Sequence, residues 1–327
     1  MILITGASGF IGSAVACELN RQGITDLIVC DRFRSNEKWK NLLGMKFTRF
    51  IQRAELFDFL TESPQAKDIR AIIHLGACTN TTEEDMDYLL VNNVNFSIFL
   101  CQWALTHNVR FIYASSAAVY GDGSQGFSDS DDLTPQLRPL NKYGFSKLMF
   151  DVWVLNNKLS DKIAGLRYFN VFGPNEYHKE EMASVIFRSF PQVDSQGKIR
   201  LFESHRPEVA HGEQARDFIY IQEAVDITLF MLNNAGVNGI FNAGTGRSHT
   251  FNELAKAMFE GLGKKPVIEY FPMPEELRAR YQYATRADMA RLRRAGYPEK
   301  EDLFAESVQR YVKEYLAPGN RYFNEVS

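Results

Sequence analysis

The sequence feature that most constrains this chain is a loop with three glycines close to its start. Gly6, Gly9 and Gly12 follow the apolar residues 2–5 and lead into a segment of helical period at residues 11–22. In such a strand–loop–helix unit, Gly6 permits a tight turn, Gly9 lets the backbone approach a pyrophosphate, and Gly12 allows close packing of the helix on the strand. The N–H groups and dipole of a helix N-terminus favour phosphate oxygens. The loop therefore predicts a dinucleotide-binding α/β fold.

Short apolar runs alternate with helical patterns through the first half of the chain. Such runs, rich in Ile, Val and Phe and almost continuously apolar, are typical of parallel strands that helices cover on both faces. The predicted strands are residues 2–5, 27–31, 71–75, 111–115 and 163–167, and the predicted helices are residues 11–22, 84–107 and 141–158. This alternation predicts a doubly wound parallel sheet, the Rossmann architecture.

The pattern changes after about residue 168. Strands 217–221 and 240–243 are expected to return to the first sheet, and Thr250 with Glu253 forms a capping-box signature. The last ten residues show no period and are expected to fray. Further strands are predicted at residues 199–202 and 267–271, and helices at residues 182–192, 223–233, 254–262, 285–295 and 301–316. We expect a dinucleotide-binding domain of residues 1–168 plus 216–246 and a smaller, discontinuous α/β substrate domain of residues 169–215 plus 247–327.

Composition and charge exclude several classes of protein. With 45% apolar and 24% charged residues and a net charge of −3, the chain is expected to be globular and to bind neither nucleic acid nor a membrane surface. No apolar stretch approaches the length needed to cross a bilayer, and four scattered cysteines indicate reduced thiols in a cytoplasmic protein. The histidines lack the spacing of zinc ligands, so we expect no metal site.

Charged residues near the end of the second predicted strand bear on which dinucleotide binds. Asp31 ends that strand, where a carboxylate could hold the adenosine ribose hydroxyls of NAD. The cations close to it in sequence or at the next strand end are Arg32, Arg34, Lys38 and Arg53. Such groups could neutralise a 2′-phosphate, so we favour NADP over NAD.

Three further residues form a proton-transfer constellation. Tyr143 and Lys147 lie four residues apart in a predicted helix and share one face, where a nearby ammonium lowers the pKa of a phenol toward neutral pH. Ser116 follows the predicted strand 111–115, at the sheet edge where ligands bind in open α/β folds. Its hydroxyl can hydrogen-bond an alcohol or carbonyl while Tyr143 transfers the proton. Lys147 could also hold the nicotinamide ribose.

Together these motifs resemble the extended short-chain dehydrogenase/reductase family. The resemblance covers most of the chain and rests on the glycine loop, residues 74–77, Asn92, Ser116, Tyr143, Lys147, and residues 167–174 and 216–218. It implies a nucleotide-sugar substrate whose diphosphate Arg216 helps to hold, and a homo-oligomer. It also implies cofactor contacts from Gly6, Gly9, Phe10, Ile11, Gly12, Asp31, Arg32, Lys38, Arg53, Leu75, Gly76, Ala77, Cys78, Thr79, Asn92, Tyr143, Lys147 and Val171.

Within that family, local motifs are similar to the branch of epimerases that invert C6 of ADP-glycero-manno-heptose, a precursor of bacterial lipopolysaccharide. These motifs are residues 74–83, His178-Lys179 ahead of residues 182–184, and residues 280–282. The resemblance implies that Tyr143 and Lys179 are the two acid/base groups needed to invert one carbon, beside catalytic Ser116 and Lys147. It implies contacts to an ADP-sugar from Ser116, Asn170, Lys179, Glu181, Arg188, Phe202, Arg216 and Tyr281.

The sequence departs from that branch beside Lys179. Glu180 and Glu181 stand where small residues are usual, and Arg188 stands where some members have His. Two carboxylates beside Lys179 could raise the pKa of its ammonium, which opposes a role as a base.

Other functions stay open from the sequence. A UDP-hexose 4-epimerase is one alternative, whereas a 4,6-dehydratase is disfavoured because Ala117 and Ala118 stand where its carboxylate pair belongs. An alternative of another class is a non-catalytic redox sensor that binds a dinucleotide, which would have no need of the Tyr143 and Lys147 chemistry.

Overall fold

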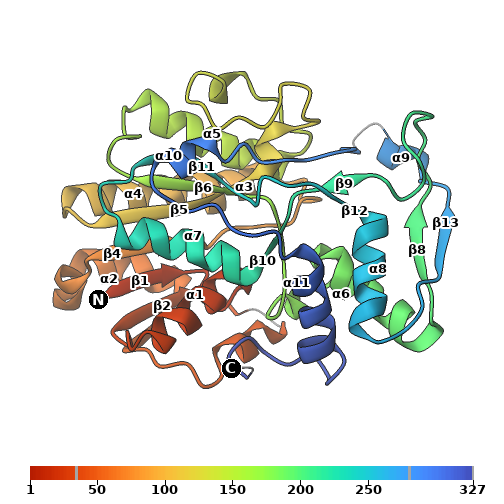
Figure 1. The fold of residues 1–327 in the computed structure, drawn as a ribbon. Coiled ribbons are helices and arrows are strands. Elements are labelled where there is room, and N and C mark those ends of the chain that lie inside the picture. The colour runs from red at the N-terminus through yellow and green to blue at the C-terminus, as the bar shows by residue number, and fades with distance from the viewer. Residues whose placement is uncertain (34–35, 279–280, 326–327) are drawn as a thin grey trace.

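A seven-stranded parallel sheet forms the centre of the computed structural model, which describes residues 1–33, 36–278 and 281–325 (Figure 1). The strand order is β11-β6-β5-β4-β1-β2-β3, and every neighbouring pair is parallel. From β1 the strands are added in one direction across the sheet up to β3, and from β4 onward they are added in the opposite direction. This reversal of strand order opens a crevice between β1 and β4 at the carboxyl ends of the strands. The strands are β1 (Ile2–Thr5), β2 (Leu27–Asp31), β3 (Arg49–Gln52), β4 (Ala71–His74), β5 (Arg110–Ser116), β6 (Ala164–Tyr168) and β11 (Gly239–Ala243).

Helices cover both faces of this sheet, as the apolar strands require. Residues of α1 (Phe10–Arg21) and α7 (Ile221–Asn233) belong to the hydrophobic cluster on one face. Residues of α2 (Leu56–Glu62), α4 (Phe96–Thr106) and α5 (Lys142–Asn156) join the cluster on the other face. Two faces covered by helices leave the edge at the carboxyl ends of the strands for ligands.

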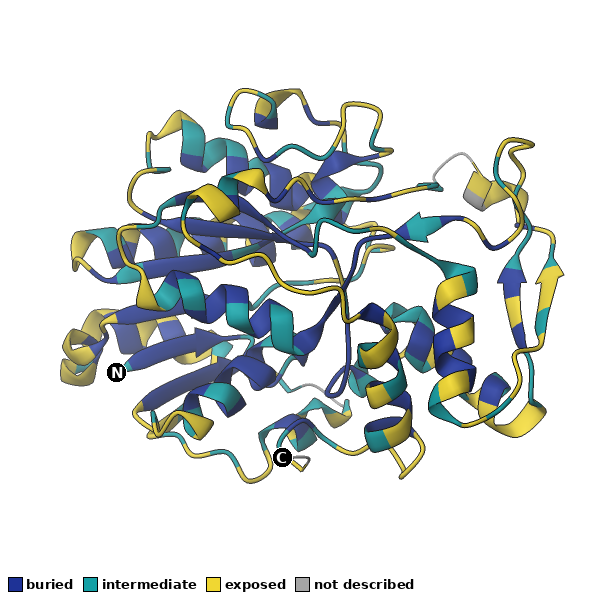
Figure 2. Cartoon of the chain, in the orientation of Figure 1, coloured by how far each residue is buried: buried dark blue, intermediate teal, exposed yellow. Residues whose placement is uncertain are grey.

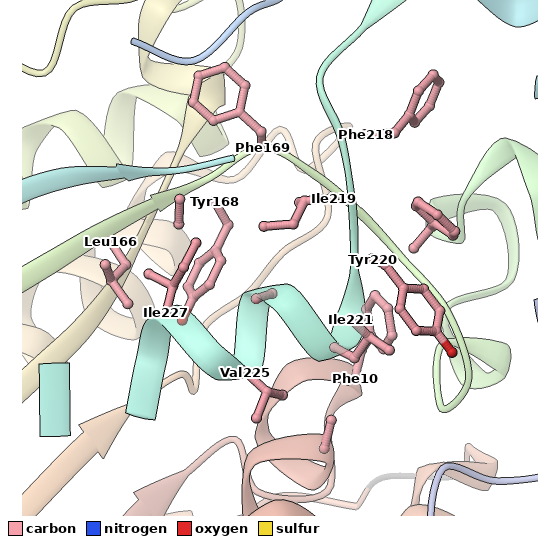
Figure 3. Packing of buried hydrophobic residues seen from close by; sticks show 14 of the residues in the cluster. Phe10, Leu166, Tyr168, Phe169, Phe218, Ile219, Tyr220, Ile221, Val225 and Ile227 are labelled. Carbon is pink, nitrogen blue, oxygen red and sulfur yellow. The ribbon is translucent and has the colours of Figure 1, made fainter. Parts of the chain in front are cut away.

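Alternation along β1 shows how the sequence builds both clusters. Ile2 and Ile4 pack into the first cluster, whereas Leu3 packs into the second, since successive strand residues point to opposite faces. All three are at most 1% exposed, and each such side chain contributes roughly 1.5–3 kcal/mol by leaving water. Figure 2 shows the central strands buried, and Figure 3 shows Ile221 and Val225 of α7 packed near Phe10.

A smaller part of the chain lies beside the carboxyl ends of the sheet (Figure 1). It holds three two-stranded sheets, which join β7 to β10, β9 to β12 and β8 to β13. Thr250 and Glu253 form the predicted capping box at the start of α8. The elements are β7 (Asn170–Phe172), α6 (Val185–Pro191), β8 (Ile199–Phe202), β9 (Ala215–Arg216), β10 (Phe218–Tyr220), β12 (His249–Thr250), α8 (Phe251–Gly261), β13 (Ile268–Phe271), α9 (Glu275–Arg278), α10 (Ala290–Arg294) and α11 (Phe304–Arg310), with the short α3 (Met86–Leu89) in the larger part.

The predicted strands 2–5, 27–31, 71–75, 111–115, 163–167 and 240–243 are confirmed in the central sheet, and four features differ from the prediction. β3 is missed because it is an edge strand with exposed Arg49 and Gln52. Strand 217–221 was expected in the main sheet, but β10 pairs with β7; only β11 returns to β6. The helix predicted at 285–295 is confined to α10. The C-terminus does not fray throughout, because Phe323 is 2% exposed and its N–H donates to Asn175 Oδ1 (2.8 Å).

One helical segment, Met86–Thr106, is long and apolar enough to cross a membrane, so the expectation that no stretch has this length was wrong. Half of its most apolar window is buried inside the protein. Leu100, Cys101 and Ala104 of this segment pack into the cluster on the sheet. Core helices of this kind meet the same criterion of length and composition.

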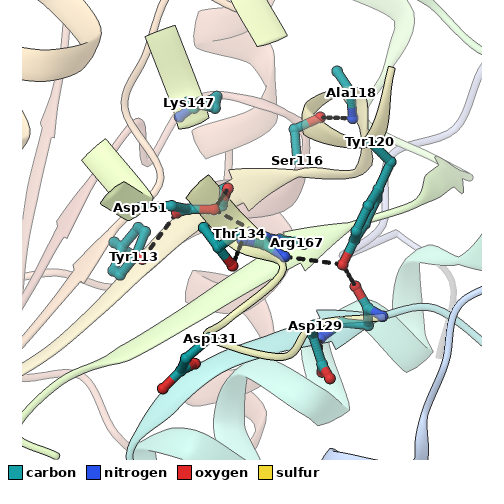
Figure 4. Close-up of polar contacts among 12 residues, drawn as sticks. Tyr113, Ser116, Ala118, Tyr120, Asp129, Asp131, Thr134, Lys147, Asp151 and Arg167 are labelled. Atoms are coloured by element: carbon teal, nitrogen blue, oxygen red, sulfur yellow. Dashed lines mark hydrogen bonds and ion pairs between the residues drawn. The ribbon is translucent and has the colours of Figure 1, made fainter. Parts of the chain in front are cut away.

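A buried ion pair joins β6 to α5 beneath the sheet edge (Figure 4). Arg167 Nε donates to Asp151 Oδ2 (2.9 Å), and both side chains are fully buried. The Tyr113 hydroxyl donates to the same carboxylate (2.9 Å), while Arg167 also donates to the Tyr120 hydroxyl (3.0 Å) and to Thr134 Oγ1 (2.8 Å). These hydrogen bonds offset the cost of removing both charges from water.

Asp151→Asn is expected to lower the free energy of unfolding by about 3–5 kcal/mol, because it leaves the Arg167 guanidinium buried without a counter-charge. Urea denaturation measures the change. The matched control is Glu269→Gln, which breaks the exposed Lys198–Glu269 pair and should cost less than about 1 kcal/mol. Equal losses in the two variants would contradict the importance of the buried pair.

Candidate active site

A cavity of about 1010 Å³ lies at the carboxyl ends of the central strands. All of the residues predicted to contact cofactor line it, as do Ser116, Tyr143, Lys147 and Lys179. Of the residues predicted to contact substrate, Asn170, Arg188, Phe202, Arg216 and Tyr281 also line it. Glu181 does not: its side chain is exposed to solvent outside this cavity, so the expected substrate contact finds no support in the structure.

The glycine loop closes one wall of the cavity. Gly6 has a φ of +69°, and its N–H donates to the carbonyl of Cys30 (2.8 Å). A Cβ at Gly6 would lie 2.7 Å from the nitrogen of Gly76, and a Cβ at Gly12 would overlap the carbonyl oxygen of Gly6. Within the described chain, α1 begins with neither a capping side chain nor an acidic first turn. Its first N–H groups are therefore free for an anion, which fits the pyrophosphate of a dinucleotide.

Asp31 is held in place by neighbours on two sides. Its Oδ2 accepts hydrogen bonds from the N–H (2.8 Å) and the hydroxyl (2.5 Å) of Ser8 in the glycine loop. Its Oδ1 accepts the N–H of Arg32 (2.6 Å) and pairs with the Lys38 ammonium. The carboxylate is only 8% exposed and its charge is largely balanced.

Two guanidinium groups accompany Lys38 at this end of the cavity. Arg32 donates to the Tyr88 hydroxyl (2.8 Å), and Arg53 lies 4.5 Å above the Phe96 ring. Burial and the nearby charge of Arg32 both lower the pKa of Arg53. Cations this close together repel one another, and a phosphate group would relieve that repulsion. Arg34, which the sequence places in the same cluster, lies outside the described residues.

The predicted proton-transfer residues come from β5 and α5. Ser116 ends β5, and α5 begins at an Asn141 cap whose side chain accepts the Gly144 N–H (2.7 Å). Tyr143 and Lys147 on the first turns of α5 are 8% and 7% exposed. Strand and helix therefore bring three polar side chains, far apart in sequence, into one cavity.

Burial controls the acidity of these groups. It raises the pKa of Tyr143, against an opposing hydrogen bond with Ser116. It lowers the pKa of Lys147 to about 8, although the Asp151 carboxylate acts in the other direction. The Lys147 ammonium donates to the carbonyl of Ala114 (2.9 Å). The expected lowering of the Tyr143 pKa by Lys147 is therefore wrong for this structure, because burial raises this pKa and the group that lowers it is Ser116.

Lys179 faces the same cavity from the 3₁₀ turn Tyr177–Met182. Its ammonium lies 5.4 Å from the centre of the Phe10 ring, at the start of α1. Burial lowers the pKa of Lys179, and the carboxylate of Glu176 opposes this effect. The expectation that Glu180 and Glu181 would raise this pKa is wrong, since both side chains are exposed and the acting carboxylate is Glu176.

The opposite end of the cavity combines a buried cation with aromatic rings. The Arg216 guanidinium lies 5.1 Å from the Tyr281 ring and 5.7 Å from the Phe251 ring, and burial lowers its pKa. The rings of Phe202 and Tyr281 meet edge to face at 6.3 Å. A poorly solvated guanidinium beside flat apolar rings suits a phosphate next to an aromatic base.

Two buried residues, Asn93 and His74, hold parts of the cavity wall in place through hydrogen bonds. Asn93, which sequence reasoning missed, accepts the Cys78 N–H (2.8 Å) and donates to the Cys78 carbonyl (3.0 Å) and the Ser146 hydroxyl (2.9 Å). His74 bonds to Thr5 Oγ1 (2.6 Å) and Ser97 Oγ (2.9 Å), and burial lowers its pKa to about 3. The loop that follows β4 is thereby fixed against α5.

Further cavity residues carried no sequence signal, because each is a lone polar or aromatic side chain. They are Tyr88, Phe96, Gln192, Arg200, Gln214, Phe251 and Phe271. The expectation of no metal site remains a prediction. Among the described residues no group of three or more His, Cys, Asp and Glu side chains could hold an ion.

Gly12→Ala is expected to weaken dinucleotide binding about ten- to a hundredfold, since the added methyl group overlaps the Gly6 carbonyl and displaces the loop. Fluorescence titration with the cofactor measures the loss. The control is Gly236→Ala, where a Cβ meets nothing within 4 Å and binding should not change. Undiminished affinity in Gly12→Ala would contradict the role of the loop.

Comparison with known proteins places this site in a family. The family model described as "NAD dependent epimerase/dehydratase family" matches residues 2–244. Over 322 residues the chain is 45% identical to a curated ADP-L-glycero-D-manno-heptose-6-epimerase of Nitratidesulfovibrio vulgaris (strain DP4), covering 98% of this chain and 100% of that protein.

Solved structures agree with that assignment. The Helicobacter pylori ADP-L-glycero-D-manno-heptose-6-epimerase matches with a TM-score of 0.76 at 28% identity, covering 97% of this chain and 95% of that one. MoeE5 in complex with UDP-glucose and NAD matches with a TM-score of 0.73 at 25% identity, covering 95% and 97%. By sequence and by fold, the chain belongs to the NAD dependent epimerase/dehydratase family.

Proposed function

We propose that this chain is an epimerase that inverts C6 of ADP-glycero-manno-heptose with bound NADP. The observation that carries the proposal is that Tyr143 and Lys179, from separate elements, line one cavity with the glycine loop. Inversion by oxidation and reduction needs a proton-transferring group for each of two orientations of the sugar carbon. The names of the relatives from Nitratidesulfovibrio vulgaris and Helicobacter pylori support the choice of sugar and of nucleotide.

The cofactor is a nicotinamide dinucleotide, which when bound supplies a hydride acceptor and donor for the sugar carbon. Tyr143 takes the C6 hydroxyl proton in one orientation, and Lys179 gives a proton to the carbonyl oxygen in the other. Ser116 hydrogen-bonds the same oxygen and orients it toward Tyr143. Lys147 holds the nicotinamide ribose. Burial lowers the pKa of its ammonium to about 8, so that Lys147 can exchange protons close to Tyr143 near neutral pH.

Residues at the far end of the cavity hold the nucleotide part of the substrate. Arg216 pairs with the diphosphate, and the rings of Phe202 and Tyr281 cover the adjoining apolar surface. Asn170 and Arg188 contact the sugar from β7 and α6. Such fixed contacts away from the reacting carbon are compatible with rotation of the sugar between its two orientations.

The arrangement of domains and copies is also part of the proposal. Residues 1–168 plus 216–246 bind the dinucleotide, and residues 169–215 plus 247–327 bind the sugar nucleotide. The protein acts as a homo-oligomer in the cytoplasm, where its four cysteines, all free in this structure, stay reduced.

Incubation of the purified protein with ADP-D-glycero-D-manno-heptose tests the proposed function directly. The L-glycero epimer should accumulate to an equilibrium mixture, which NMR of the C6 proton detects. Turnover of UDP-glucose to UDP-galactose, without inversion of the heptose, would instead identify a 4-epimerase. No turnover of either sugar nucleotide would contradict the proposal.

Tyr143→Phe is expected to lower kcat by about 10²–10⁴-fold, since it removes a proton-transferring hydroxyl. Cofactor content should stay close to that of the unmodified protein, because the ring keeps its packing. Measuring both quantities separates a catalyst from a redox sensor. If Tyr143→Phe changes neither kcat nor cofactor content, the result would favour a sensor that only binds dinucleotide.

Arg53→Ala is expected to weaken NADP binding about ten- to a hundredfold, through loss of a charge-assisted contact to the 2′-phosphate. NAD, which lacks that phosphate, should lose far less affinity. Competitive titration of the apoprotein with the two cofactors gives the ratio. The control is Arg49→Ala, at the opposite end of β3 and outside the cavity. Equal losses for NAD and NADP would contradict the assignment of NADP.

A further inference from the structure

Glu176 precedes Lys179 by three residues and does not line the cavity. Its side chain is fully buried. The carboxylate accepts hydrogen bonds from the N–H of Gly173 (3.3 Å) and from the N–H (2.6 Å) and hydroxyl (2.7 Å) of Ser184. These donors stand at the two ends of the segment 173–184, so one carboxylate closes the loop that carries Lys179.

The backbone of that loop is strained immediately after Lys179. Glu180 has φ +50° and ψ −117°, a conformation that residues with a side chain rarely adopt. Strain of this kind persists only where surrounding contacts over-determine the backbone. Those contacts are present here: the Lys179 N–H donates to the Glu176 carbonyl (2.9 Å), and the Ala183 N–H donates to the Glu180 carbonyl (3.0 Å).

The same loop is anchored from outside the cavity. The Asn175 side chain donates to the Ser13 hydroxyl of α1 (2.9 Å) and accepts the Phe323 N–H (2.8 Å). Asn41 donates to the Asn175 carbonyl (3.0 Å). These hydrogen bonds fix the segment that carries Glu176 to residues near the start of the chain and near its end. The Glu176 carboxylate is therefore held in one position.

The charge of Glu176 acts on few groups. Lys179 is the cation that favours its ionised form, while burial disfavours it. The phenols of Tyr177, in the same turn, and of Tyr311, in the helical segment Tyr311–Leu316 that follows α11, face the carboxylate. On the Lys179 side stands His178, whose pKa burial and the neighbouring cations lower to about 4, so that it is neutral. Among the residues that the structure describes, Glu176 is the carboxylate whose charge favours the Lys179 ammonium against its burial.

We propose that Glu176 is a positioning residue for Lys179: its carboxylate closes the strained loop so that the ammonium faces the cavity, and its negative charge stabilises that ammonium. The inference rests on the proposed function for the catalytic importance of Lys179. The coupling of the two side chains does not depend on that function. Without the carboxylate, the buried amine loses its proton more readily and the loop loses its closure.

Titration of the Lys179 amine in Glu176→Gln tests this coupling. The rate of acetylation of Lys179 by acetic anhydride, followed by peptide mass spectrometry across pH, reports the fraction of free amine. A negative neighbour favours the ammonium, so its removal should move the midpoint to lower pH by about one unit. Ser184→Ala, which removes a hydrogen bond and keeps the charge, should leave the midpoint in place. An identical midpoint in Glu176→Gln and the unmodified protein would overturn the proposal.

A second variant covers the case in which Glu176→Gln does not fold. Glu180→Gly removes the backbone strain that the carboxylate holds, so Glu176→Gln with Glu180→Gly should be folded by circular dichroism. Its Lys179 midpoint should still lie lower than that of Glu180→Gly alone. A midpoint equal to that of Glu180→Gly would overturn the proposal.

Activity measurements distinguish failure of this proposal from failure of the proposed function. If the unmodified protein inverts the heptose, Glu176→Gln should lower kcat about tenfold, with KM for the sugar nucleotide little changed. The alkaline limb of its pH–rate profile should move to lower pH together with the amine midpoint. Absence of epimerase activity in the unmodified protein overturns the proposed function, while a shifted midpoint still supports the coupling.

Discussion

Removal of proton-carrying side chains from water is the physical constraint on which the site depends. Tyr143, Lys147 and Lys179 share one cavity, and burial shifts the pKa of each toward its neutral form. The two amines can therefore exchange protons with a substrate near neutral pH, whereas Tyr143 must lose its own proton before it can act as a base. Ser116 hydrogen-bonds Tyr143, the Ala114 carbonyl accepts a hydrogen bond from Lys147, and the charge of Glu176 favours the Lys179 ammonium.

The architecture explains how these groups come together. Parallel strands deliver Ser116 from β5 and the glycine loop from β1 to the same edge, and the reversal of strand order leaves space there. The smaller part of the chain then supplies Lys179, Arg216 and the aromatic rings from short elements beside that edge. The buried Arg167–Asp151 pair lies beneath, where Asp151 also acts on Lys147. Asp151 thus stabilises the fold through Arg167 and also acts on the pKa of Lys147.

Much of the fold and the site could be predicted from the sequence, because local patterns encode them. The apolar runs predict the buried strands, and the glycine loop with Tyr143 and Lys147 predicts the cavity edge that the structure shows. β3 escaped prediction because an exposed edge strand has no apolar run. The sequence analysis also missed that the helical segment Met86–Thr106 is long and apolar enough to cross a membrane, because asparagines interrupt its apolar residues.

Tertiary contacts account for what sequence reasoning could not find. Glu176 acts on Lys179 through a folded loop, whereas the adjacent Glu180 and Glu181 point to solvent; only the backbone path decides this. Asn93 and Arg32 likewise make hydrogen bonds to residues distant in sequence, Cys78 and Tyr88, which no local pattern predicts. The pKa of Tyr143 depends on burial, which the spacing of Tyr143 and Lys147 does not encode.

The central claim is that one carbon of the sugar is oxidised and then reduced inside this cavity. The most direct measurement uses ADP-heptose with deuterium at C6, turned over in ordinary water and examined by mass spectrometry and NMR. The account predicts that the epimerised product keeps the deuterium at C6, because the same hydride leaves and returns. Loss of the label to solvent would contradict it, since inversion would then proceed by removal of a C6 proton.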